Sequence, residues 1–289
     1  MSKYRKEISI ISSISELSRT VDVWFLDIWG VIHNGVVPFE NSVLACQSFR
    51  KRGGYILLLT NAPRTSASVI AQLDQIGVPR SAYNAIVTSG DVTRGVLKSW
   101  LHKSIYHLGP IYNTEVFQGL KLTFSTPLTA DTIVCTGLLN DEKESPNDYL
   151  SLLNSFQSRS TRMLCVNPDL KIKRGNKTVY CAGAIAQIYE NLGGEVIYSG
   201  KPYAPIYDFA FNKVSNDLKE NISKERILAI GDGVLTDING AATVGIQSVF
   251  IASGIHMDLS KSLEKKILAK LFYGFGNDQP VAAMSALKW

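Results

Sequence analysis

Short, continuous apolar runs alternate along the chain with segments whose apolar residues recur at helical spacing. The runs that we predict to be strands are 23–26, 55–59, 85–87, 195–198, 227–230 and 248–251. Their apolar residues are consecutive rather than alternating, which is typical of strands covered on both faces. The segments with helical spacing, each closely followed by glycine, are 39–50, 66–76 and 181–192. Glycine commonly ends a helix, and this alternation predicts an α/β fold with a parallel sheet.

The middle of the chain has a different pattern, with few polar residues at strand ends and a long polar loop at 140–147. Its strand-like runs are 104–108, 132–136 and 162–166, and its helix candidate is 148–156. We interpret this part as an inserted α+β domain. The predicted division is therefore a first core part at 1–101, an insert at 102–180 and a second core part at 181–289. An amphipathic helix is also predicted over 258–272.

Two carboxylates follow predicted strands that are far apart in the sequence. Asp27 directly follows the run 23–26, and Asp232 follows the run 227–230 after a single glycine, Gly231. Open parallel sheets bind ligands outside the carboxyl ends of their strands. The two side chains are therefore candidates to meet around a hard cation such as Mg²⁺, which prefers oxygen ligands.

The composition favours a soluble globular protein and excludes several classes of partner. The chain has 289 residues, of which 45% are hydrophobic and 19% charged, with a dispersed net charge of +5. Such a mild excess predicts no nucleic-acid interface. The four cysteines lack the spacing of a metal site, and no apolar run is long enough to span a membrane. We expect a cytoplasmic protein with no signal peptide and no membrane partner, and a homodimer is compatible with the sequence.

Four strand-end motifs follow one another along the chain: Asp27-Ile28-Trp29-Gly30-Val31, Leu59-Thr60-Asn61, Gly200-Lys201-Pro202 and Gly231-Asp232-Gly233 with Thr236-Asp237. Their order resembles that of the haloacid dehalogenase-like (HAD) hydrolases, and in particular the NagD-like branch. Phosphatases of that branch carry a large cap inserted between the second and third motifs. The resemblance implies a Rossmann-like parallel sheet core, an inserted α+β cap and a Mg²⁺-dependent hydrolase.

The resemblance also implies the roles of individual residues. Asp27 would attack phosphorus, form an aspartyl-phosphate and share Mg²⁺ with Asp232 and the backbone carbonyl of Trp29. Thr60 would bind a phosphate oxygen with the help of Asn61.

Further residues complete the implied site. Lys201 would neutralise the charge of the phosphate and the nucleophile. Asp237 would hold Lys201 or a metal-bound water. Asn167 and Asp169 resemble the cap segment that faces the substrate in this branch, although a plain Asn-Pro-Asp turn fits the same residues.

Trp29 departs from the family pattern, in which an aspartate two residues after the nucleophile transfers protons to the leaving group and from water. The indole nitrogen only donates hydrogen bonds, so Trp29 cannot do this work. General acid–base catalysis contributes roughly 10²–10⁴-fold, so the sequence predicts slow hydrolysis. His33 is a substrate-binding candidate that could replace the missing group, but packing is the more common role for a histidine at such a position.

Three functional hypotheses remain. The first is a Mg²⁺-dependent phosphatase of a small phosphorylated metabolite. The second is a regulatory protein that binds metal and phosphate with little turnover, which Trp29 motivates. The third is another reaction of a nucleophilic aspartate, such as dehalogenation or carbon–phosphorus cleavage. Dehalogenation needs no metal, so Asp232 argues against it.

Overall fold

The computed structural model describes residues 7–174, 177–253 and 263–289, and it divides into two compact units. The first unit comprises residues 1–60, 70–86 and 207–289, and the second comprises 61–69 and 87–206. Among the described residues, no helix has the length and apolar character needed to cross a bilayer.

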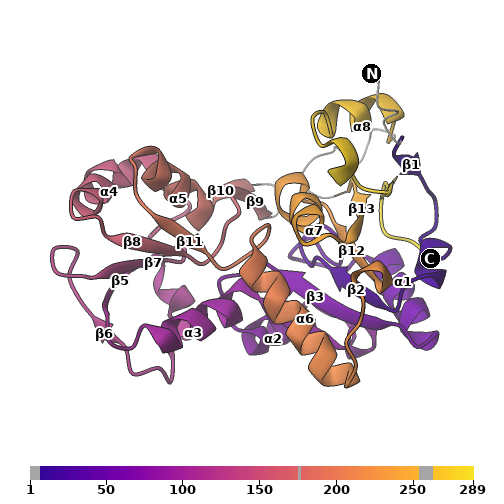
Figure 1. Ribbon diagram of the computed structural model, residues 1–289, viewed down its shortest axis with the longest axis horizontal. Helices are drawn as coiled ribbons and strands as arrows, with labels where there is room; N and C mark the ends of the chain where they lie inside the picture. The colour runs from indigo at the N-terminus through magenta and orange to yellow at the C-terminus, as the bar shows by residue number, and fades with distance from the viewer. Residues whose placement is uncertain (1–6, 175–176, 254–262) are drawn as a thin grey trace. The chain divides into compact units, whose positions relative to one another are not determined.

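A seven-stranded sheet forms the framework of the first unit (Figure 1). In spatial order its strands are β1 (Ser9–Ile10), β14 (Ala282–Met284), β13 (Gln247–Ile251), β12 (Ile227–Gly231), β2 (Val23–Leu26), β3 (Tyr55–Thr60) and β4 (Ala85–Thr88). The helices that accompany it are α1 (Glu40–Lys51), α2 (Ser66–Ile76), α6 (Ala204–Leu218), α7 (Asn239–Val244) and α8 (Lys265–Leu271). The neighbouring strands from β1 to β3 run parallel, which confirms the predicted α/β fold.

Successive residues of β2 show why this strand reads as a continuous apolar run. The ring of Trp24 stacks on Phe49 of α1 at a centroid distance of 4.2 Å. The next ring, that of Phe25, contacts Phe211 of α6 at 5.4 Å. Adjacent side chains of a strand point to opposite faces, so each face of β2 is covered by a helix and every position is apolar.

The second unit contains a five-stranded sheet with the order β11 (Val196–Tyr198), β8 (Arg162–Cys165), β7 (Thr132–Cys135), β5 (Ser104–Leu108) and β6 (Thr123–Phe124). All of its strand pairs are parallel. A separate antiparallel hairpin joins β9 (Lys171–Arg174) to β10 (Lys177–Tyr180).

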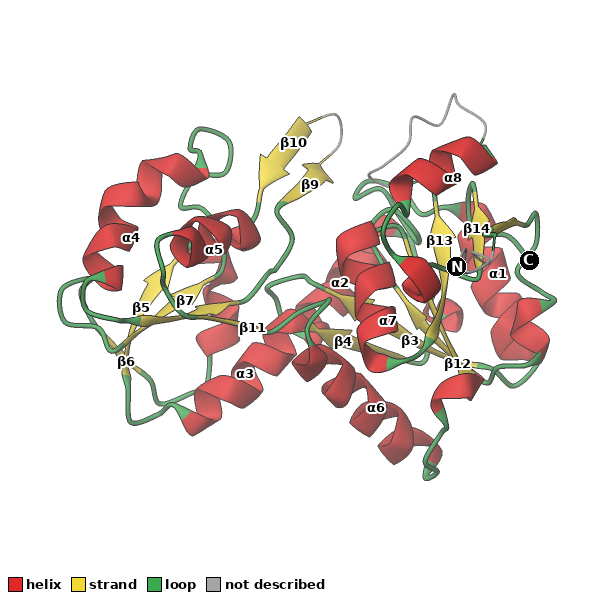
Figure 2. Cartoon of the chain, turned by 45° about the horizontal axis from the view of Figure 1, so that its top comes forward, coloured by secondary structure: helices red, strands yellow, loops and turns green. Residues whose placement is uncertain are grey.

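Helices cover both faces of this second sheet (Figure 2). One apolar cluster joins alternate residues of β7 and β8 to α4 (Leu150–Gln157) and α5 (Ala182–Asn191). The other cluster joins Val134 of β7 and Leu164 of β8 to α3 (Ser89–Ser99) and the 3₁₀ segment Ile111–Phe117. The unit therefore has two apolar layers, one on each side of its sheet.

The structure adds detail to two predicted elements, the strand at 195–198 and the helix at 258–272. The run 195–198 forms the strand β11, but β11 pairs with β8 in the five-stranded sheet and not with the strands of the first unit. The helix predicted over 258–272 is observed as α8 from Lys265, and its first part, 258–262, lies outside the described residues.

Candidate active site

Three buried carboxylates meet at the carboxyl ends of two neighbouring strands. Asp27 follows β2 and Asp232 follows β12, and these strands pair with Leu26 opposite Ile230. The backbone N–H of Asp27 donates to the carbonyl of Ile230 at 2.9 Å, so the two strand ends are aligned. Asp237 joins them, and ligand oxygens of the three aspartates lie within 4.8 Å of one another.

The position of Asp237 depends on two glycines of the same motif. Its Oδ2 accepts the N–H of Gly233 at 2.9 Å, across the first turn of the π-helical segment Val234–Ile238. A Cβ on Gly231 would lie 2.2 Å from the carboxyl carbon of Asp237, and one on Gly233 would lie 2.0 Å from Oγ1 of Thr236. Both positions therefore require glycine, and they hold the carboxylate close to the strand end.

The donor set fits a hard divalent cation. All three groups are carboxylates, and their residues are only 3–8% exposed. Buried carboxylates at this spacing repel one another unless a positive charge compensates them. Oxygen ligands of this kind suit Mg²⁺, which keeps several waters and binds through one or two protein carboxylates.

Trp29 and His33 belong to a compact turn that follows the nucleophile candidate. Their rings meet edge to face with centroids 5.0 Å apart. Gly35 has a φ of +90°, and a Cβ there would lie 2.5 Å from the indole of Trp29. The half-buried indole therefore packs directly against the glycine backbone.

His33 is held inside the same turn. It is 1% exposed, and its Nδ1 accepts the N–H of Gly35 at 2.8 Å. Burial lowers the pKa of His33 to about 4, because desolvation penalises the imidazolium form. The ring is therefore neutral near pH 7, with one nitrogen already engaged.

Asn61 is predicted to bind substrate, and in the structure its side chain forms hydrogen bonds with Asp169 and Lys201. Its Nδ2 donates to Oδ1 of Asp169 and to the carbonyl of Lys201, both at 3.0 Å. Its Oδ1 accepts the N–H of Lys201 at 2.7 Å. The amide thus pairs with both backbone groups of Lys201 and ties the second motif to the third.

The residues around this pairing are closely packed. Asn167 is buried, and its Oδ1 accepts the N–H of Asp169 at 3.0 Å. A Cβ on Gly200 would lie 2.4 Å from Oδ1 of Asn61 and 2.7 Å from Cδ of Pro168. The glycine before Lys201 is therefore needed for the close approach of the Asn167–Asp169 segment.

The structure groups the predicted residues into two sets. Asp27, Asp232 and Asp237 come together in the first unit, together with the turn that holds Trp29 and His33. Thr60 is the last residue of β3 and is 3% exposed. Asn61, Asn167, Asp169 and Lys201 come together in the second unit, where Lys201 is 3% exposed. The approach of Lys201 to Asp27 stays a prediction.

Residues for which no structural role was predicted hold the loop after Asn61. Oγ of Ser89 donates to the carbonyls of Asn61 and Ala62, both at 2.9 Å. Oγ1 of Thr88 donates to the carbonyl of Arg64 at 2.6 Å. The run Thr88-Ser89-Gly90 at the end of a predicted strand was the available signal, because small hydroxyl residues there bind neighbouring backbone.

Comparison with known proteins connects this geometry to a family. The profile of the haloacid dehalogenase-like hydrolases matches residues 24–123, and an HAD-hydrolase-like profile matches 198–270. The crystal structure of a haloacid dehalogenase-like hydrolase from Brucella suis is 41% identical with a TM-score of 0.82, covering 85% of this chain and 94% of that one.

More distant relatives have named activities. The 5'-nucleotidase YutF of Bacillus subtilis is 20% identical, over 82% of this chain and 89% of its own. The ribonucleotide monophosphatase NagD of Escherichia coli is 24% identical, over 79% of this chain and 86% of its own. The structure of a 4-nitrophenylphosphatase from Thermotoga maritima shares the fold, with 18% identity, a TM-score of 0.70 and coverage of 93% and 96%.

Proposed function

This chain belongs to the haloacid dehalogenase-like hydrolases, and we propose that it is a Mg²⁺-dependent phosphatase of a small phosphorylated metabolite. The observation that carries the proposal is the cluster of three buried carboxylates at the ends of β2 and β12. The named activities of YutF and NagD support phosphate monoesters as the substrate class, and they make nucleotides reasonable first candidates.

In the proposed reaction a carboxylate oxygen of Asp27 attacks phosphorus. A bond forms between that oxygen and phosphorus while the bond from phosphorus to the leaving oxygen breaks. Water then attacks the aspartyl-phosphate, which releases phosphate and restores Asp27. Thr60 donates to a phosphate oxygen, and the ammonium group of Lys201 offsets the charge that two anionic partners bring together.

Asp27, Asp232 and the backbone carbonyl of Trp29 would hold Mg²⁺, with Asp237 fixed beside them by Gly233. The cation supplies charge screening that lets an anionic nucleophile approach an anionic phosphate. In this proposal Asp237 would hold a metal-bound water or Lys201.

Proton transfer is the weak point of this site. Trp29 has no group that can protonate a leaving oxygen, and His33 is a neutral, buried ring whose Nδ1 is occupied by Gly35. The proposal therefore includes slow turnover, with a preference for leaving groups that depart without a proton.

In this proposal the inserted segment determines which substrate the enzyme accepts. We assign 102–180 as the cap, with Asn167 and Asp169 facing the substrate and 1–101 and 181–289 as the core. A cytoplasmic location and a homodimer complete the proposal.

The test is a screen for phosphate release over many phosphorylated metabolites, with Mg²⁺ and with a chelator. Asp27→Asn and Asp232→Asn should abolish the Mg²⁺-dependent release, while Asp208→Asn, an exposed carboxylate of α6, should retain it. Full turnover in Asp27→Asn would exclude the aspartyl-phosphate route. Binding of Mg²⁺ and phosphate without turnover of any substrate would favour the regulatory alternative that Trp29 motivates.

A further inference from the structure

The loop of residues 61–66, which joins Asn61 to the start of α2, is held from two sides within the second unit. On one side it contacts the N-terminus of α3. Besides the bonds from Thr88 and Ser89, the N–H of Gly90 donates to the carbonyl of Ala62 at 3.3 Å. A Cβ on Gly90 would lie 2.2 Å from the carbonyl oxygen of Arg64. The loop and α3 are thus in direct backbone contact.

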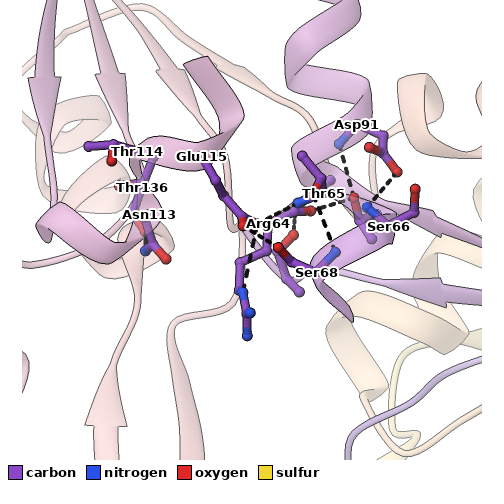
Figure 3. Close-up of polar contacts among 12 residues, drawn as sticks. Arg64, Thr65, Ser66, Ser68, Asp91, Asn113, Thr114, Glu115 and Thr136 are labelled. Carbon is purple, nitrogen blue, oxygen red and sulfur yellow. Dashed lines mark hydrogen bonds and ion pairs between the residues drawn. The ribbon is translucent and has the colours of Figure 1, made fainter. Parts of the chain in front are cut away.

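On its other side the loop meets a carboxylate from the inserted segment. Oε1 of Glu115 accepts the N–H of Thr65 at 2.8 Å, and Oε2 accepts the hydroxyl of Ser68 (Figure 3). The guanidinium of Arg64 lies 3.7 Å from Oε1. From the α3 side, Oδ2 of Asp91 accepts the next N–H, that of Ser66, at 3.1 Å. Two carboxylates therefore bind the first turn of α2, where free N–H groups and the helix dipole favour negative charge.

Glu115 is itself fixed by its surroundings. It lies in the 3₁₀ segment Ile111–Phe117, in which Asn113 is buried and donates to the carbonyl of Thr136 at 3.1 Å. The guanidinium of Arg94 donates to the carbonyls of Val116 and Gln118 at 3.0 and 2.8 Å. The segment is therefore bound at both ends, and its carboxylate is only 20% exposed.

We propose that Glu115 is a positioning residue for catalysis: it fixes the 61–66 loop and, through it, Asn61 and the neighbouring phosphate-binding Thr60. This inference rests on the proposed phosphatase function. Shifts of about 1 Å in groups that position a substrate can cost 10²-fold in rate. We expect Glu115→Ala to lower kcat about tenfold and to change KM much less, because the loop is displaced rather than removed.

The chain offers a matched control. Oε2 of Glu144 accepts one backbone N–H, that of Asn140 at 2.8 Å, and one hydroxyl, that of Tyr149 at 2.6 Å. Glu115 also binds one backbone N–H and one hydroxyl, besides its partly exposed ion pair with Arg64. Both glutamates are half-buried in the second unit. Glu144→Ala should therefore cost similar stability while leaving kcat within about twofold of wild type.

Two further variants separate positioning from folding. Glu115→Gln keeps an acceptor for Thr65 and a polar partner for Ser68, so it should restore kcat to within about threefold of wild type. Ser68→Ala removes one of the two bonds and should lower kcat by less than Glu115→Ala does. It stays informative if Glu115→Ala fails to fold.

The experiment measures kcat and KM with 4-nitrophenyl phosphate and Mg²⁺, together with backbone hydrogen exchange by mass spectrometry. Exchange should rise in peptides covering 61–69 for Glu115→Ala, and in peptides covering 139–149 for Glu144→Ala. Unchanged exchange over 61–69, or an equal loss of kcat in both alanine variants, would overturn the proposal. An inactive wild-type protein would overturn the phosphatase assignment and with it the catalytic role of Glu115, while the exchange comparison would still show whether Glu115 fixes the 61–66 loop.

Discussion

Replacing Asn61 tests whether the second and third motifs are joined as the structure indicates. The side chain makes three hydrogen bonds, two to the backbone of Lys201 and one to Asp169. At roughly 1 kcal/mol for each bond, Asn61→Ala should lower the free energy of unfolding by about 3 kcal/mol. The effect should be large because Asn61 is 4% exposed, so water cannot readily replace the lost partners.

The aspartate variant sharpens this prediction. Asn61→Asp keeps the acceptor for the N–H of Lys201 but loses both donors, and it places a carboxylate about 3 Å from that of Asp169. Because these like charges repel, Asn61→Asp should be at least as destabilised as Asn61→Ala, although it is the closer match in shape.

The assay is urea unfolding at neutral pH, extrapolated linearly to zero denaturant. Asn154→Ala is the control, because this exposed asparagine makes one bond to its own helix and should change stability by less than about 0.5 kcal/mol. An Asn61→Ala variant as stable as that control would refute the reasoning. So would an aspartate variant more stable than the alanine variant.

Two further predictions concern the turn after Asp27. Gly35→Ala should destabilise by about 3 kcal/mol, because positive φ and overlap with Trp29 both oppose a Cβ. Gly53→Ala, with a φ of +88° and open space, should cost only about 1 kcal/mol, and equal losses on urea unfolding would disprove the packing of Trp29. In a series of substrates at saturating Mg²⁺, aryl and acyl phosphates should react at least about tenfold faster than alkyl phosphates, because Trp29 donates no proton. A rate insensitive to leaving-group pKa, lost in His33→Ala, would instead assign the proton to the histidine.

An element could be predicted from the sequence where its burial leaves a recognisable pattern of apolar residues. The run Val23–Leu26 is covered by helices on both faces, so its four consecutive apolar residues identified a central strand. The run that forms β11 also contains consecutive apolar residues, but apolar character does not encode which sheet a strand joins. Helix α3 was not predicted from the sequence. Its first residues, Ser89 and Gly90, contact the 61–66 loop and have low helix propensity.

The candidate site divides in a similar way. Asp27 and Asp232 could be predicted to meet because the carboxyl ends of paired parallel strands share an edge, and the three carboxylates do cluster. The partners of Asn61 could not be predicted, since Lys201 and Asp169 are more than 100 positions away along the chain. Glu115 carried no signal in the sequence, because a single glutamate is ordinarily a solvated side chain.

The contacts of the 61–66 loop bear on whether the insert is a detachable module. A cut-and-splice design that removed 102–180 would delete Glu115 and Asp169 together. The N–H of Thr65 and the amide of Asn61 would then lose their carboxylate partners next to Thr60. A minimal enzyme made by trimming the insert would therefore need new acceptors for these two donors. The same requirement applies to grafting a foreign insert onto this core, for which a carboxylate at the position of Glu115 would be a better selection criterion than overall shape.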